Sequence, residues 1–127
     1  MDNDTAAYLV ESRSAYIARV ESEGGKIIIP GPFDAQVDID TEDQYEQFCK
    51  GADIYERVTG EQLSYVVTES KSGLPKRHIR VTTGFPMDDV FRIALQAALG
   101  SDPIRELLSL IRVMHGVGDP TVFAEWE

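Results

Sequence analysis

The sequence predicts a single α+β domain in which helices cover one face of an antiparallel-rich sheet. A length of 127 residues is that of one domain, and a hydrophobic content of 43% is enough to build a core. Segments with the two-residue period of a strand also alternate along the chain with segments of helical period. We therefore expect residues 1–127 to fold as one unit.

The first part of the chain contains one predicted helix and two predicted strands. Residues 4–23 place apolar side chains among charged ones at helical spacing, which stops at Gly24-Gly25. Residues 26–29 are a short β-branched run closed by prolines, which indicates a strand or an edge segment. Apolar and polar side chains alternate over residues 35–40, so this strand should bury one face and expose an acidic one.

The next predicted helix spans residues 42–58. Thr41 and Gln44 form a capping box at its start, and Gly60 follows its end. Cys49 lies on its apolar stripe, so we expect a buried small hydrophobic side chain there. Because Cys49 is the only cysteine, no disulfide forms within the chain, and a reducing, cytoplasmic location is expected.

The second half of the chain contains a predicted hairpin, two helices and a short edge strand. Residues 62–69 and 76–83 are strands joined by a turn-rich segment. Helices over residues 86–99 and 103–114 follow, and residues 121–126 form the edge strand. The predicted apolar stripes of these helices are Val90, Phe91, Ala94, Leu95 and Ala98, and then Ile104, Leu107, Leu108, Ile111 and Met114.

Polar residues at the last helix are expected to have structural roles. Asp102-Pro103 reads as its cap and first turn, and His115 lies at its end, where a histidine favours the helix dipole. Arg105 and Arg112 share one helical face, and surface salt bridges are their expected use in so acidic a chain.

The order of elements matches a ferredoxin-like or RNA-recognition-motif-like sandwich, in which the helices leave one sheet face open. The alternation places Asp38 and Asp40 on the open face of one strand and His78, Arg80 and Thr82 on that of another. Two carboxylates separated by one residue on a strand lie roughly 7 Å apart and are suited to hard divalent ions. The alternative is an ordinary surface acid pair, in which Asp40 assists the amino end of the following helix.

The net charge restricts the partners that the chain is expected to bind. Twelve Lys+Arg against 22 Asp+Glu give a net charge of −10 at pH 7. Such a surface repels phosphate backbones, which argues against a chain that coats DNA or RNA unaided. The composition leaves room for a basic protein partner or a metal-mediated phosphate contact. No signal pattern or membrane-spanning apolar run occurs, so no membrane contact is expected.

One pattern resembles a known family. Val37-Asp38-Ile39-Asp40 is similar to the acidic strand motif of archaeo-eukaryotic primases and primase-polymerases. Further along, Ser72-Gly73 and His78 resemble the Ser-Gly turn that leads to a histidine in that family. The resemblance covers about residues 33–83 and implies a fold like that of the RNA-recognition motif.

The resemblance also implies roles for individual residues. Asp38 and Asp40 would bind catalytic Mg²⁺ or Mn²⁺, and His78 would contact the triphosphate of an incoming nucleotide. Ser72 in the preceding turn would adjoin the phosphates, and Arg80 on the face of His78 would neutralise another phosphate charge.

The family also places a third metal-binding acid on a later strand. The nearest candidates here are Asp102 and Asp119, both in turn-like contexts rather than on a strand.

Two functions of different class are predicted. The first is a small primase-like domain with a metal and nucleotide-phosphate site, which serves nucleotidyl transfer in DNA replication. Nucleoside triphosphate or nucleic acid would be its partner, and the size suits a phage or mobile-element protein. The alternative is a noncatalytic acidic module on a reduced primase-like fold, which binds a basic protein or mimics nucleic acid.

Overall fold

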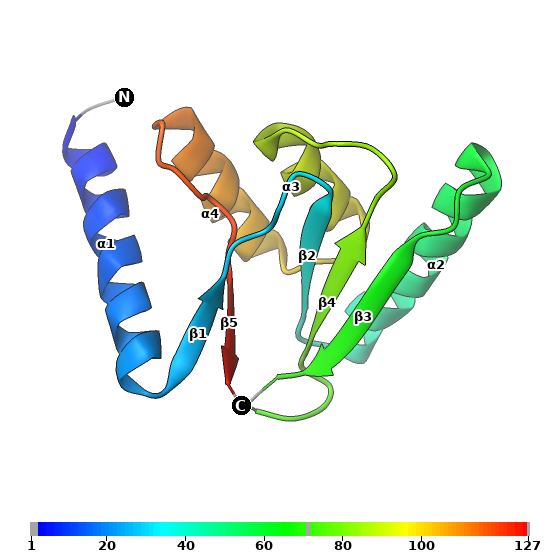
Figure 1. The fold of residues 1–127 in the computed structure, drawn as a ribbon, viewed down its shortest axis with the longest axis horizontal. Helices are drawn as coiled ribbons and strands as arrows, with labels where there is room; N and C mark the ends of the chain where they lie inside the picture. The colour runs from blue at the N-terminus through cyan, green and yellow to red at the C-terminus, as the bar shows by residue number, and fades with distance from the viewer. Residues whose placement is uncertain (1–2, 71, 127) are drawn as a thin grey trace.

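The computed structural model describes residues 3–70 and 72–126, which form an α+β fold (Figure 1). The helices in these ranges are α1 (Asn3–Ser22), α2 (Glu42–Thr59), α3 (Asp89–Ala98) and α4 (Pro103–Met114). The strands are β1 (Gly25–Ile28), β2 (Asp34–Ile39), β3 (Ser64–Glu69), β4 (Arg77–Thr82) and β5 (Phe123–Trp126). The predicted α+β class is confirmed, although α3 begins later than expected because Asp88 caps it. None of the helices in the described ranges is both long and apolar enough to cross a membrane.

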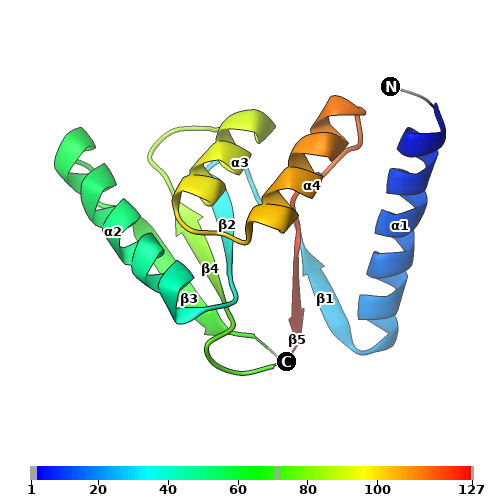
Figure 2. The same ribbon diagram turned by 180° about the vertical axis from the view of Figure 1, so that it is seen from behind.

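The strands form two antiparallel sheets. In the three-stranded sheet β4 is central, with β2 and β3 paired on either side. The predicted strand at residues 35–40 therefore lies beside the predicted hairpin, and Asp38 lies opposite His78 in the register. β1 and β5 form a separate two-stranded sheet, and α1 lies beside it in both views (Figures 1 and 2).

The main core lies between the three-stranded sheet and the helices on one side of it. Ala35, Val37 and Ile39 are fully buried there, as the alternation in β2 predicts, but the other face of the strand is not exposed as expected, because Gln36 is buried and Asp38 is partly buried. Figures 1 and 2 show α2 and α3 on the same side of the sheet. The predicted capping box fixes the start of α2, and Phe48 of this helix is buried in the same cluster.

Polar side chains of α3 and α4 face inward, so most of the predicted apolar stripes are wrong, although Leu95 of the α3 stripe packs against the core. Arg92 and Gln96 are buried in α3 beside Ile93, and Glu106 and Ser109 are buried in α4. The residues of the predicted stripes that are exposed instead are Val90, Phe91, Ala94, Ala98, Ile104, Leu107, Leu108 and Met114.

The buried polar residues of α3 and α4 are explained by the edge of β2 that is not paired with β4. The N–H of Gln36 donates to Gln96 Oε1 at 2.8 Å, and the N–H of Asp38 donates to Ser101 Oγ at 2.9 Å. Arg105 Nη1 in turn donates to the carbonyl oxygen of Gln36 at 2.8 Å. Because buried backbone groups need partners, α3, α4 and the turn between them present polar side chains to this edge, and most residues of the predicted apolar stripes point away.

Cys49 is exposed, so its predicted burial is wrong. Phe48 lies on the side of α2 that faces the sheet. Successive side chains of an α-helix are rotated by about 100° around the helix axis. The side chain of Cys49 therefore lies on the solvent side. Val58, near the end of the same helix, is also exposed.

Candidate metal centre

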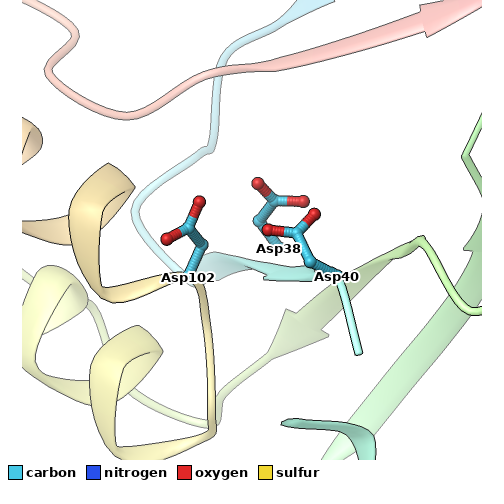
Figure 3. A group of neighbouring side chains, drawn as sticks. All are labelled: Asp38, Asp40 and Asp102. Carbon is cyan, nitrogen blue, oxygen red and sulfur yellow. The ribbon is translucent and has the colours of Figure 1, made fainter. Parts of the chain in front are cut away.

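Three carboxylates converge at the carboxyl end of β2 (Figure 3). Asp38 lies in β2, Asp40 directly follows this strand, and Asp102 directly precedes α4. Each side chain offers one carboxylate oxygen, and the three oxygens lie within 4.8 Å of one another. The predicted acid pair is thus joined by Asp102, one of the two candidates for a third acid, whereas Asp119 does not belong to the group.

Backbone contacts hold Asp102 beside β2. Its N–H donates to the carbonyl oxygen of Asp38 at 2.8 Å. Its carboxylate accepts the N–H of Ile104 at 3.0 Å, which confirms the predicted helix cap. Gly100, which leads into this turn, has a φ of 86°, and a Cβ there would lie 2.7 Å from the carbonyl oxygen of Gln44. This close, left-handed turn therefore requires glycine.

Burial and mutual repulsion disfavour ionised carboxyls in this group. Desolvation is the largest cause of the raised pKa of Asp38; Asp102 and Glu106 raise it further, while Arg105 lowers it. The pKa of Asp40 is raised by desolvation first, and then by Asp38 and Asp102. A bound divalent cation would offset this repulsion, so the donor set favours cation binding.

His78 lies directly opposite Asp38 on the neighbouring strand. Its Nε2 is 3.7 Å from Asp38 Oδ1, and its ring stacks on Phe123 with the centroids 4.1 Å apart. Desolvation, followed by the charge of Arg105, lowers the pKa of His78 below its ordinary 6.5. The imidazole is therefore neutral at pH 7, its contact with Asp38 is not an ion pair, and it offers one N–H donor.

A cavity of about 390 Å³ lies beside the triad. Asp38 and His78 line one part of it, and Arg13, Arg105 and Arg112 also line it. The seven-residue spacing of Arg105 and Arg112 indicated a shared helical face. No signal in the sequence brings Arg13 of α1 to the same place, so sequence reasoning missed this cluster.

The salt bridge predicted for Arg105 is formed, but not at the surface. Arg105 forms an ion pair with Glu106 at 2.7 Å, and both side chains are largely buried. Arg112 Nη1 donates to the carbonyl oxygen of Pro120 at 3.3 Å. His115 is the residue that ends α4, as predicted.

The two other residues predicted to adjoin phosphates do not line this cavity. Ser72 is exposed in the turn between β3 and β4. Arg80 shares a sheet face with His78, but its guanidinium lies 3.9 Å from the carboxylate of Glu125. It lines a second hollow together with Asp34.

The arrangement combines two kinds of chemistry. Carboxylate oxygens are the ligands that Mg²⁺ and Mn²⁺ prefer, so Asp38, Asp40 and Asp102 fit a hard divalent cation. Guanidinium groups in the adjoining cavity suit phosphate oxygens, which they bind through charge-assisted hydrogen bonds. Comparison of the chain with protein-family models, with curated proteins and with solved structures found no match.

Proposed function

We propose that the chain binds a nucleoside triphosphate together with Mg²⁺ or Mn²⁺, and that its reaction is nucleotidyl transfer in DNA replication. The observation that carries this proposal is a triad of carboxylates next to a cavity with cationic walls. The resemblance to primases adds support, because β2 and β4 pair so that Asp38 of the acidic motif lies opposite His78.

Each residue near the triad has a role in this proposal. Asp38, Asp40 and Asp102 hold the cation, and water completes its coordination. The bound cation would neutralise phosphate charge and align a hydroxyl group for in-line attack. His78, which is neutral at pH 7, donates its N–H to a phosphate oxygen. Because the imidazole is largely buried, this hydrogen bond is stronger than it would be in water.

Calorimetry with Mn²⁺ tests the metal site. We expect Asp40→Asn to weaken Mn²⁺ binding by roughly tenfold or more, the loss that even outer partners of a metal site produce. Asp53→Asn is the matched control, because Asp53 is exposed on α2 and pairs with Arg57. Unchanged Mn²⁺ binding in both Asp38→Asn and Asp40→Asn would mean that the acids are surface residues without a metal role.

A primer-extension assay with Mn²⁺ and nucleoside triphosphates tests the reaction. Metal-dependent extension that Asp40→Asn abolishes would support nucleotidyl transfer. Nucleotide binding that depends on the triad without extension would instead indicate a site used for recognition alone.

The noncatalytic acidic module is the second candidate, because the net charge is −10 and α4 exposes Leu107 and Leu108. In this case the partner is a basic protein with an apolar surface. Salt-sensitive binding of a basic peptide, with no response to Mn²⁺ or nucleotide, would favour this candidate over the enzyme.

A further inference from the structure

Positive charge gathers in one cavity of an otherwise acidic chain. Arg13 of α1 and Arg105 and Arg112 of α4 line it, with Asp38 and His78 in the same wall. The chain has 12 Lys+Arg against 22 Asp+Glu, so an abundance of basic residues does not explain this cluster. Figures 1 and 2 show that α1 and α4, which are distant in sequence, lie near each other here.

Backbone carbonyl groups orient two of these guanidinium groups. Arg13 donates from Nη1 to the carbonyl oxygen of Asp119 and from Nη2 to that of Pro120, the latter at 2.9 Å. Arg112 Nη1 donates to the same oxygen of Pro120 at 3.3 Å. Carbonyl oxygens accept these bonds without neutralising the charge of the arginines.

Within residues 3–70 and 72–126, no carboxylate lies at ion-pair distance from Arg13 or Arg112, although the charge of Asp119 acts on Arg13 and partly offsets the lowering of its pKa by desolvation. Of the three arginines that line the cavity, Arg105 forms an ion pair with a described residue, and its partner is Glu106. In addition, Arg112 Nε is buried and has no hydrogen-bond partner in the described part of the chain. A buried N–H donor without an acceptor is costly, so the described protein groups do not fully satisfy the Arg112 guanidinium.

Mutual repulsion acts on the same two residues. The pKa of Arg13 is lowered to about 10, first by desolvation and then by the charge of Arg112. The pKa of Arg112 is lowered by desolvation and by the charge of Arg105. An anion in the cavity would offset the repulsion between these arginines and favour their charged forms.

We propose that the arginine cavity binds the di- or triphosphate group of a nucleotide, with Arg13, Arg105 and Arg112 as its anchors. The identity of the ligand as a nucleotide rests on the function proposed above, whereas the polyphosphate site rests on the arginines. The phosphate chain extends from the wall formed by Asp38 and His78, next to the carboxylate triad, toward the guanidinium groups.

The chemistry favours phosphate over a single carboxylate. Three guanidinium groups provide several positive charges along one cavity, and their planar N–H groups match phosphate oxygens in bidentate contacts. The volume of about 390 Å³ falls within the range of about 300–1,000 Å³ that is usual for small-ligand sites.

A purely structural role for the arginines predicts a different result. Arg13 and Arg112 would then only fix the segment before β5 through its carbonyl groups, and phosphate would leave them unaffected. The N–H at Arg112 Nε separates the two roles, because no described residue accepts its hydrogen bond. Its nuclear magnetic resonance signal would shift on phosphate binding and stay in place if the role is structural.

The experiment is a titration of the full chain with inorganic pyrophosphate in the presence of a metal chelator. We expect saturable binding and a shift of the Arg112 Nε–H signal, which is assigned by its loss in Arg112→Lys. Arg13→Gln and Arg112→Gln should each weaken pyrophosphate about tenfold or more, as expected for lost charge-assisted hydrogen bonds. Arg57→Gln removes the same charge from the exposed side of α2 and should leave the affinity unchanged.

Further variants and ligands complete the experiment. Where a glutamine variant fails to fold, judged by circular dichroism, Arg13→Lys and the wild-type titration take its place. The affinity for adenosine triphosphate is compared with the affinities for pyrophosphate and for adenosine. Tighter binding of adenosine triphosphate than of pyrophosphate supports a nucleotide ligand. Equal affinities for these two ligands mean that the phosphate chain alone determines binding. Binding of adenosine that matches that of the triphosphate overturns the proposal.

The metal-free conditions separate this inference from the proposed function. Asp40→Asn should weaken the Mn²⁺ response and leave metal-free pyrophosphate binding intact. If pyrophosphate does not bind, or binds equally to the Arg13 and Arg112 variants, the arginine site is wrong while the metal site stands. If pyrophosphate binds through the arginines but Mn²⁺ does not bind the triad, the proposed function fails and the anion site remains.

Discussion

Asp40 carries a charge that lowers the stability of the metal-free protein. Its folded pKa is raised above the ordinary 3.8 by desolvation and by the neighbouring acids. Folding therefore favours the protonated form, so the stabilising contribution is present in acid and is lost as pH rises through the folded pKa. Because solvent screens this partly exposed carboxylate, we expect Asp40→Asn to raise the free energy of unfolding at pH 7 by at most about 1 kcal/mol.

Urea unfolding at pH 7 with a chelator measures this gain, which should shrink as the pH falls toward 3.8. Asp53→Asn is again the control and should change stability by less than about 0.5 kcal/mol. Added Mn²⁺ should reverse the order, because ligand binding stabilises wild type and not the variant. A variant less stable than wild type without metal would contradict the repulsion described for this triad.

At the scale of elements, the turn between α3 and α4 positions Asp102. We expect Gly100→Ala to destabilise the protein by roughly 1–3 kcal/mol, because it adds strain at positive φ and a contact with the Gln44 carbonyl. Mn²⁺ binding should weaken as well, since Asp102 lies two residues further on. Thermal unfolding and calorimetry measure the two effects.

Gly116→Ala is the matched control for this turn. Gly116 has a similar φ of 70°, but a Cβ there would meet nothing within 4 Å. It should therefore show the backbone strain alone and leave Mn²⁺ binding unchanged. Equal losses in the two variants would show that the close approach to Gln44 is unimportant.

The helices and strands were predictable from local sequence patterns. Which sides of α3 and α4 are buried was not predictable in this way. Alternation in β2 correctly placed Val37 and Ile39 in the core, because that strand faces apolar side chains. The same reasoning failed for Leu107 of α4, because the element beside α4 is a polar strand edge. A hydrophobic period predicts which side of a helix is buried only when its neighbour is apolar.

The candidate site divides in the same way. The closeness of Asp38 and His78 followed from strand pairing, which local patterns indicate. The approach of Asp102 depends on a tertiary contact between the start of α4 and β2, and that of Arg13 on how α1 lies beside α4. Neither arrangement leaves a local signal, so Asp102 was predicted only as one of two candidates for the third acid and the arginine cluster was not predicted.

At the scale of the whole molecule, a net charge of −10 destabilises the compact state through self-repulsion. We expect an increase from about 0.05 to about 0.5 M NaCl to raise the midpoint of thermal unfolding by roughly 4 °C, equivalent to about 1 kcal/mol. Mg²⁺ at equal ionic strength should give a larger rise in wild type but not in Asp40→Asn. An equal response of both proteins to Mg²⁺ would attribute the effect to screening alone.

The polar contacts along β2 also bear on aggregation. Groups from α3, α4 and the turn between them occupy the free edge of β2, so another chain finds no unpaired backbone groups at Gln36 and Asp38. On the opposite edge of the three-stranded sheet, every residue of β3 is exposed, including Tyr65 and Val66. An added strand would therefore join this sheet at β3, the edge that is open to intermolecular β-pairing. The contacts that fix the carboxylates thus also set the direction in which the sheet is able to grow.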